Sequence, residues 1–548
     1  TELGAGVDEG DAHGVSRGCG VFPGLSGAYP AVRLSLGCAA VSAGNVTGRQ
    51  TRPRPEWTVC APVLDPDRPR RLAAALTEFA DDTSLTSSPD VLALFHQVAA
   101  TVPAYGAFLA ERGIDPDAVR TLEAFRELPL TDKESYHHRY PLADRCRGGR
   151  PADLDIVAVS SGSSGRPTLW PRSAVDELHI ARRFEQIFAD AFRAAERSTL
   201  AVVCFPLGTW VGGLFTTNCV RLLSAKGYPV TVVAPGNKPE EILRVLPELA
   251  PGFDQTVLLG YPPFLKDVID TGIAGGLDWS RFAVKLVFAG EVFSEEWRDI
   301  VGERAGSTDP VHDTASLYGT ADAGVLGTET PLSITVRRFF AARPDAAREV
   351  FGDARLPTLV QYDPGSRWFE EQEGTLLFTG DSGVPLIRYH IADEGGVIPY
   401  DEMLRVCADH GFDPVASAGT DGRGLPFVYV FGRSLFTVSF FGANIYPENV
   451  TVGLEQPGIH DWVTGRFVLE VVEDAAHDRQ LRVTVERAPG KDGDPAELAR
   501  SIRTELLRLN SEFANYVPVD RQLPHIELRD FGDPEYFPQG VKHRYTRG

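Results

Sequence analysis

The chain has 548 residues, of which 43% are hydrophobic and 24% are charged, and its formal net charge is −21. One hydrophobic core rarely serves a chain of this length, so we expect two or more domains. The acidic balance argues against a nucleic-acid-binding protein, because recognition of a phosphate backbone requires a basic face. It does not exclude a bound nucleotide, because a few backbone N–H groups and local cations suffice to hold phosphates.

The seven cysteines are scattered along the chain, with no Cys-x-x-Cys pair and no histidine at zinc-ligand spacing. This pattern indicates reduced thiols rather than a disulfide framework or a metal cluster. No apolar run approaches the roughly 20 residues of a membrane span, and the first residues lack the order of a secretory signal. We therefore expect a cytoplasmic protein without a membrane or nucleic-acid partner.

Residues 1–55 are rich in Gly, Ala, Ser and Val and show no sustained helical or strand period. This composition predicts a flexible N-terminal extension, or an artefact of an upstream start. Apolar residues at helical spacing begin near Pro66 and continue to about Tyr140. Within this stretch, residues 90–113 predict a helix that ends at Gly113.

Short apolar runs separated by helical stretches fill residues 152–292, which is typical of βαβ units and a mostly parallel sheet. From about Asp363 the turns become denser and the apolar runs look like antiparallel strands. Near the end of the chain, two strand-like runs and an amphipathic helix predict a small α+β unit. The predicted fold class is therefore α/β, with a large multi-sheet domain over residues 56–432 and a small, mobile α+β domain over residues 433–548.

A glycine- and serine-rich segment lies between a strand-like run and a long helical pattern. Glycines let the backbone approach an anion closely, and hydroxyl and N–H groups can then surround phosphate oxygens. Taken alone, the segment is equally typical of a flexible linker, and it is not a Walker loop, because G-x-x-x-x-G-K-[ST] is absent. The candidate phosphate-binding residues are Ser160, Ser161, Gly162, Ser163, Ser164, Gly165 and Arg166.

The order hydroxyl-hydroxyl-Gly-hydroxyl-hydroxyl-Gly-basic-Pro resembles the phosphate loop of the adenylate-forming superfamily, which includes acyl-CoA synthetases, adenylation domains and luciferases. Within that superfamily the chain looks most like phenylacetate-CoA ligases, because the segment "ELPLTDKESYHHRYPL" resembles their opening. The resemblance runs from about Val102 to Arg547, with the motifs in the family's order. It implies an enzyme that uses ATP and Mg²⁺ to activate a carboxylic acid as its adenylate.

The segment "YGTAD" resembles the family's Tyr-Gly-x-Thr-Glu motif. The resemblance implies that the ring of Tyr318 stacks near adenine, that Gly319 follows it in the nucleotide site, and that Asp322 holds Mg²⁺. One carboxylate beside bound ATP is sufficient for Mg²⁺, which also takes phosphate oxygens as ligands. Ala321 stands where the α-phosphate-binding hydroxyl is expected, so Thr320 is the alternative donor.

Two further segments are assigned to the nucleotide by the same resemblance. Gly290 and Glu291 would line the adenine through backbone groups, although a plain turn between strand and helix also explains this pattern. Two acids compete for the ribose hydroxyls. Asp381 lies in a Thr-Gly-Asp string, whereas Asp393 follows Leu-Ile-Arg-Tyr, as the ribose acid does in phenylacetate-CoA ligases, and we prefer Asp393.

The resemblance also assigns residues near the predicted hinge. Arg433 matches an arginine that contacts the nucleotide, and Gly442 matches a glycine that admits the pantetheine arm of coenzyme A. The relatives carry an acid just after Gly-Arg-Ser, where this chain has Leu435 and Phe436. Lys542 matches the lysine that bridges the carboxylate and the α-phosphate, a position in which a cation stabilises the transition state.

Aromatic residues suggest where the acid binds. Trp210 and Phe215 lie in "FPLGTWVGGLF" and Tyr261 in "LLGYPPFL", the stretches that surround the acyl group in relatives, although aromatic residues in such segments more often belong to an ordinary core. Lys133 also matches a family position, and we interpret it as structural.

Three interpretations of function stay open. In the first, a small, aryl-type acid is activated and then forms a thioester with coenzyme A, so that ATP, Mg²⁺ and coenzyme A are the expected cofactors. In the second, which the missing hinge acid favours, the acceptor is an amine, a carrier-protein thiol or another nucleophile. In the third, which Ala321 favours, the chain binds nucleotide without turnover. A homodimer is one option for the oligomeric state.

Overall fold

An 11-stranded sheet forms the centre of the chain, with strand order β10-β11-β12-β13-β9-β8-β7-β6-β5-β3-β4. The residues described by the computed structural model belong to one unit, Asp65–Gly548. They are 68–81, 90–151, 154–160, 168–352, 356–433, 438–474, 476–537 and 545–546. The predicted N-terminal extension, residues 161–167 of the glycine-rich loop and Lys542 lie outside them.

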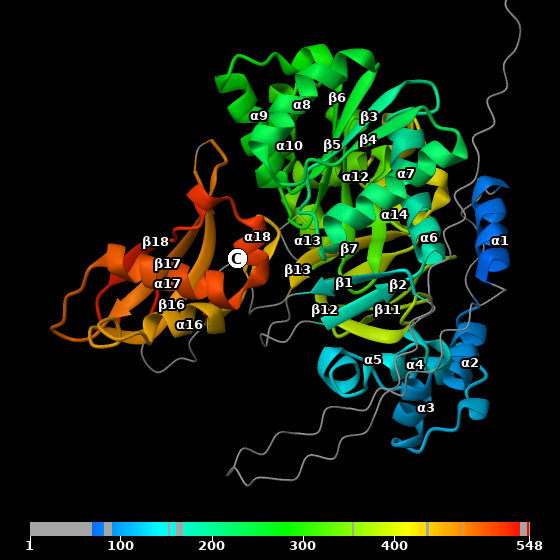
Figure 1. The fold of residues 1–548 in the computed structure, drawn as a ribbon, viewed down its shortest axis with the longest axis horizontal. Helices are drawn as coiled ribbons and strands as arrows, with labels where there is room; N and C mark the ends of the chain where they lie inside the picture. Colours follow the sequence, from blue (N-terminus) through cyan, green and yellow to red (C-terminus); the bar gives the residue numbers. More distant parts are fainter. Residues whose placement is uncertain are drawn as a thin grey trace, which may run out of the picture. The chain divides into compact units, whose positions relative to one another are not determined.

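Strands β3 to β7 pair in parallel and alternate with helices, as the apolar runs predict (Figure 1). Every residue of β3 and β5 is buried, because parallel strands are covered on both faces. The predicted βαβ pattern is confirmed. In chain order these elements are β3 (Thr199–Val203), α7 (Thr216–Lys226), β4 (Val230–Val233), α8 (Pro239–Leu249), β5 (Gln255–Gly260), α9 (Pro262–Ala274), β6 (Val284–Ala289), α10 (Glu295–Arg304), α11 (Pro310–Asp313) and β7 (Thr314–Thr320).

Beyond β7 the neighbouring strands of the sheet run antiparallel. The dense turns after Asp363 therefore connect antiparallel strands, as predicted. Four helices in this part share a separate apolar cluster with β9 and β13. The elements are β8 (Gly324–Thr328), α12 (Pro331–Ala341), α13 (Pro344–Phe351), β9 (Thr358–Gln361), β10 (Trp368–Gln372), β11 (Thr375–Gly380), β12 (Leu386–Ile398), α14 (Tyr400–Asp409), α15 (Pro414–Ala418) and β13 (Phe427–Arg433).

The helical stretch before the sheet consists of several short helices. The prediction of one helix ending at Gly113 is wrong, because the chain bends by 96° between α2 and α3. Pro103 starts the second helix, and its ring and missing N–H prevent the first from continuing. The helices are α1 (Arg68–Asp81), α2 (Val91–Thr101), α3 (Pro103–Ala110), α4 (Leu122–Arg126) and α5 (Leu142–Arg145).

In the described part of the chain, no single helix is long and apolar enough to cross a membrane, and the bent pair α2 and α3 meets the length and composition test only together.

The glycine-rich loop connects the two strands of a hairpin. Strands β1 (Ile156–Ser160) and β2 (Thr168–Arg172) are antiparallel, and Ser160 pairs with Thr168. Helix α6 (Ala174–Gln186) follows after Ser173, whose side chain accepts a hydrogen bond from the backbone of Asp176. The predicted order of strand, loop and long helix is thus interrupted by one additional strand.

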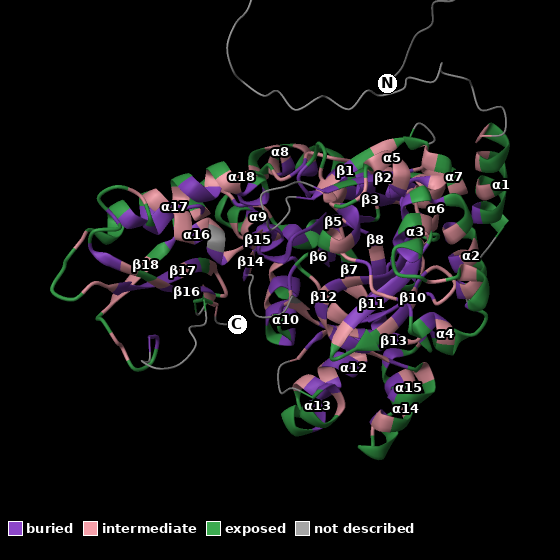
Figure 2. Cartoon of the chain, turned by 90° about the horizontal axis from the view of Figure 1, so that it is seen from below, coloured by how far each residue is buried: buried purple, intermediate pink, exposed green. Residues whose placement is uncertain are grey.

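The C-terminal part has a three-stranded sheet of its own, in the order β16-β17-β18, and the two strand-like runs predicted there pair as β16 and β17. Figure 2 shows buried residues along these strands and exposed residues on outer helices such as α14 and α15. A single apolar cluster includes β3, β5 and the C-terminal elements, and the domain boundary at residue 433 stays a prediction. The elements are β14 (Val438–Phe440), β15 (Ala443–Ile445), α16 (Pro447–Leu454), β16 (Val463–Glu473), β17 (Arg479–Arg487), α17 (Pro495–Leu509), α18 (Ser511–Tyr516) and β18 (His525–Arg529).

Candidate active site

A cavity of about 1460 Å³ lies where the carboxyl ends of β6 and β7 meet the hairpin β14–β15 and helix α18. Ligands of parallel α/β sheets bind beyond the carboxyl ends of the strands. The cavity wall contains most of the candidate residues that the structure describes, although they come from distant parts of the chain. These residues are Ser160, Phe215, Tyr261, Gly290, Glu291, Tyr318, Gly319, Thr320, Asp322, Asp393 and Gly442.

Some candidates are not brought into this wall. Trp210 is not among the lining residues, and its ring packs edge-on against Tyr516 with the ring centroids 5.0 Å apart. Arg433 ends strand β13, and its side chain is not described. The remaining candidates lie outside the described residues and stay predictions: Ser161, Gly162, Ser163, Ser164, Gly165, Arg166 and Lys542.

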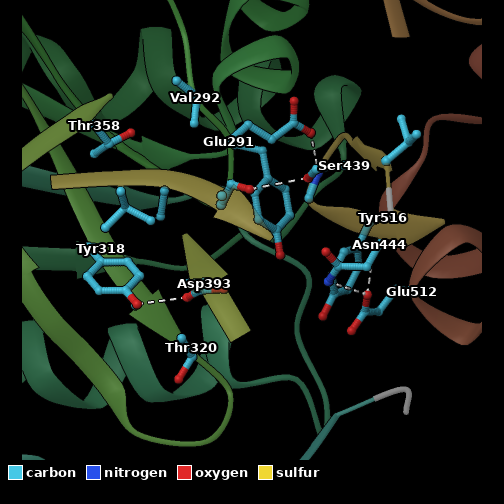
Figure 3. Close-up of a pocket in the computed structure, with 18 of the residues that line it drawn as sticks. Glu291, Val292, Tyr318, Thr320, Thr358, Asp393, Ser439, Asn444, Glu512 and Tyr516 are labelled. Atoms are coloured by element: carbon cyan, nitrogen blue, oxygen red, sulfur yellow. Dashed lines mark hydrogen bonds between the residues drawn. The ribbon is translucent and has the colours of Figure 1, made fainter. Parts of the chain in front are cut away.

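The structure separates the two acids that compete for the ribose. Asp393 is 6% exposed, lines the cavity, and accepts a hydrogen bond of 2.7 Å from the hydroxyl of Tyr318 (Figure 3). A register shift in β12 between His390 and Glu394 includes this residue, and Ala392 there has a φ of 64°. Such bulges redirect side chains next to active sites. Asp381 lies outside this cavity and pairs with Arg147 at 2.6 Å, with half of its side chain exposed.

Asp322 is 4% exposed and has two partners in the cavity wall. It accepts a hydrogen bond of 2.6 Å from the hydroxyl of Tyr389, and the Nζ of Lys133 lies 3.3 Å from its Oδ2. Lys133 also lines the cavity, and its interpretation as structural stays a prediction. Both of these contacts use Oδ2, so Oδ1 is the candidate ligand atom for a cation.

Among the described residues there is no group of three or more His, Cys, Asp or Glu side chains that could hold a metal ion. This donor set still fits Mg²⁺, which proteins often bind through one or two carboxylates while substrate phosphates and water complete its octahedron. Asp322 is the candidate carboxylate.

Two residues that support the site do not stand out in the sequence. Trp170 is 2% exposed, and its indole N–H donates a hydrogen bond of 3.1 Å to the hydroxyl of Ser160, at the start of the glycine-rich loop. Tyr389 contacts Trp170 edge-on and donates to Asp322. In the sequence, Trp170 is marked by its place in the strand directly after the loop. This signal is weak, because a large apolar residue is typical of any buried strand.

An aromatic wall continues from the large sheet to the C-terminal part. The ring of Tyr261 contacts Phe205 at 5.1 Å and Tyr516 at 5.3 Å between centroids. A Cβ atom on Gly290 would lie 2.9 Å from the Tyr261 ring, and one on Gly442 only 2.4 Å. Both glycines also have positive φ values, so the close approach of this ring requires glycine at both positions.

Glu291 connects the cavity to the C-terminal part. Its carboxylate accepts a hydrogen bond from the backbone N–H of Gly442 and forms an ion pair with Arg479. Arg479 also donates to the carbonyl of Val292 at 2.7 Å and to Glu473 at 2.7 Å. The carboxylate of Glu291 thus binds strand β17 and the hairpin β14–β15, a role that its position in the sequence does not reveal.

Comparison with known proteins shows a likeness in sequence and in fold. No family model matches the chain. A phenylacetate-coenzyme A ligase from Aromatoleum evansii is 22% identical over 315 residues, which cover 54% of this chain and 62% of the relative. The chain is similar to phenylacetate-coenzyme A ligases. The enzyme of this name from Thermus thermophilus is also 22% identical, over 53% of this chain and 60% of its own length, so the match spans about three fifths of these curated relatives.

The solved structure of a 2-hydroxyisobutyryl-CoA ligase, in complex with its acyl-AMP and CoA, superposes with a TM-score of 0.58 at 17% identity. It covers 88% of this chain and 91% of that ligase. The chain therefore shares the fold of this ligase, and the predicted α/β fold class is confirmed. The likeness to phenylacetate-coenzyme A ligases and this fold agree with the motifs that the cavity brings together.

Proposed function

We propose that the protein activates a small, aryl-type carboxylic acid with Mg·ATP, releases pyrophosphate, and transfers the acyl group from the adenylate to a second substrate. The observation that carries this proposal is the meeting of Ser160, Tyr318, Asp322 and Asp393 in one cavity. In the resemblance, these residues contact the phosphates, the adenine, Mg²⁺ and the ribose respectively. The aromatic residues Phe215 and Tyr261, which line the same cavity, support an aryl acid.

The chain's own groups bind and orient the substrates. Asp393, held by the hydroxyl of Tyr318, accepts hydrogen bonds from the ribose hydroxyls, while Ser160 and Thr320 offer hydroxyl groups to phosphate oxygens. Lys542 bridges the acid and the α-phosphate. Little covalent chemistry is required of the protein, so positioning and charge stabilisation account for the rate. Asp322 would hold Mg²⁺, and the bound ion would neutralise part of the phosphate charge.

The resemblance makes coenzyme A the first candidate for the second substrate, with Gly442 on its path. An amine or a carrier-protein thiol is the alternative. A cytoplasmic location and a homodimer stay predictions.

Acid-dependent exchange of labelled pyrophosphate into ATP tests the activation step. We expect exchange with at least one acid of a panel of aryl and alkyl carboxylates, and with aryl acids best. ATP binding without exchange for any acid of the panel would contradict activation and support the nucleotide-binding interpretation.

Replacing Asp393 with asparagine is expected to raise the KM for ATP about 10- to 100-fold, since one or two charge-assisted hydrogen bonds to the ribose are lost. Asp381→Asn is the matched control, because Asp381 lies outside the cavity and is paired with Arg147. This variant should retain the wild-type KM. The reverse result, with the larger effect at Asp381, would reassign the ribose contact.

A further inference from the structure

Among the described residues, the C-terminal side of the cavity offers little positive charge to an anionic acceptor. Arg466 and Arg479 line this side, and both are in ion pairs. Arg466 lies 3.2 Å from Glu486, and Arg479 binds Glu291 and, at 2.7 Å, Glu473. The cations that the described residues supply here are thus already neutralised. Coenzyme A carries several phosphate charges and requires cations that are free to pair with them.

Glu512 on helix α18 lines the same side of the cavity and is only 8% exposed. Its Oε2 accepts hydrogen bonds from the backbone N–H of Asn444 at 3.0 Å and from the Asn444 side chain at 3.2 Å (Figure 3). In the described part of the chain, no cation lies within ion-pair distance of this carboxylate. Burial of a charge without an opposite charge is unfavourable, so a cationic ligand would be stabilised at this position.

Glu512 also lies next to the wall that would hold the acid. After burial itself, the charge of Glu512 is the largest influence that raises the pKa of Tyr261, and it raises the pKa of Tyr516 as well. Figure 3 shows Glu512 beside Tyr516 and Asn444. A group bound to Glu512 is therefore close to Tyr261, the residue that the resemblance assigns to the acyl group.

The ring of Tyr261 lies directly beside Gly442, the glycine that the resemblance assigns to the path of the pantetheine arm. The ring of Tyr261 packs so closely on Gly442 that a single Cβ atom there would lie 2.4 Å from it. The backbone N–H of Gly442 is bound to Glu291 in addition. An extended arm that passes this glycine would have to displace the ring, whereas a small acceptor beside Glu512 would not.

We propose that the second substrate is a small molecule that carries a protonated amine, and that Glu512 pairs with its ammonium group. This inference rests on the proposed formation of an acyl-adenylate. The ammonium gives one proton to the Glu512 carboxylate, and the nitrogen lone pair then forms a C–N bond with the acyl carbon. The C–O bond to phosphate breaks, AMP leaves with the electron pair, and the second proton passes from nitrogen to solvent. The product is an amide.

Benzylamine is the probe for the test, because its ring matches the aromatic wall and its ammonium matches Glu512, and neutral benzyl alcohol is the control ligand. Calorimetry on the enzyme without acid or ATP should detect binding of benzylamine in preference to benzyl alcohol. Glu512→Gln should weaken benzylamine binding about tenfold, since it removes one ion pair and keeps an oxygen for the hydrogen bonds of Asn444. Glu505→Gln is the matched control, because Glu505 is equally buried but pairs with Arg508 outside the cavity.

With an acid selected by pyrophosphate exchange, mass spectrometry should detect the benzylamide, and Glu512→Gln should lower its yield at limiting amine, whereas Glu505→Gln should leave both the yield and the exchange rate at wild-type values. Equal binding of the two ligands, amide formation that Glu512→Gln does not affect, or a coenzyme A thioester as the only product would overturn the inference. Exchange is measured before any acceptor is added, and amine binding requires no adenylate. A failure of the proposed activation step is therefore distinguishable from a failure of the amine site.

Discussion

Replacement of Lys542 with alanine is expected to reduce acid-dependent pyrophosphate exchange by about 10²- to 10³-fold, the usual effect of removing one group that stabilises transition-state charge. The amino group would lie between the carboxylate of the acid and the α-phosphate, where negative charges approach each other during adenylate formation. The exchange assay reports this step alone, so a defect in acyl transfer would not be mistaken for it.

Lys491→Ala is the matched control for this variant. Lys491 is an exposed lysine in the C-terminal part and does not line the cavity. The control should exchange pyrophosphate at the wild-type rate. If Lys542→Ala also does so, Lys542 has no role in adenylation and the resemblance fails at its last motif.

Replacement of Arg298 with alanine is expected to lower the free energy of unfolding by about 3–5 kcal/mol, the cost of removing one partner from a buried ionic network. The Arg298 side chain is fully buried and binds Glu295 at 2.9 Å and Glu329 at 2.7 Å. It also donates to the hydroxyl of Thr314 at 2.7 Å. Its loss would leave two carboxylates buried with fewer cations. Denaturant unfolding measures the difference.

Arg405→Ala provides the comparison, because Arg405 is exposed and its only ion pair in the described residues, with Glu402, has a distance of 3.8 Å. This variant should unfold at the wild-type denaturant concentration. An Arg298→Ala variant as stable as the wild type would mean that this buried network does not stabilise the fold.

Local features of the structure are well predicted from the sequence. The runs "LAVVCF" and "TVLLG" become the fully buried strands β3 and β5, because a parallel strand requires apolar side chains on both faces. Helix α17 lies within the segment that was predicted to be an amphipathic helix. The wrong prediction of a single helix across Pro103 also has a local cause. The apolar period of the sequence continues past this proline, but a helix cannot.

The roles of charged side chains depend on partners that are distant in the sequence. Asp381 and Asp393 both lie in short motifs that are plausible for a ribose-binding acid. The register of β12 and its bulge direct only Asp393 into the cavity. Lys133 and Asp322 are 189 residues apart in the sequence. They form an ion pair because the N-terminal helices pack on the sheet. No local pattern predicts such a pair.

The sequence by itself determined the α/β fold, the order of the motifs and the likeness to acid-activating ligases, since all three depend on local periodicity and on short strings of residues. The tertiary structure alone decided that Glu291 binds Arg479 rather than only lining a nucleotide, and that Glu512 is buried in the cavity wall with no cation from the described residues beside it. The reason is physical. Burial and pairing of a carboxylate depend on which elements pack around it, and the chain brings those elements together only when it is folded.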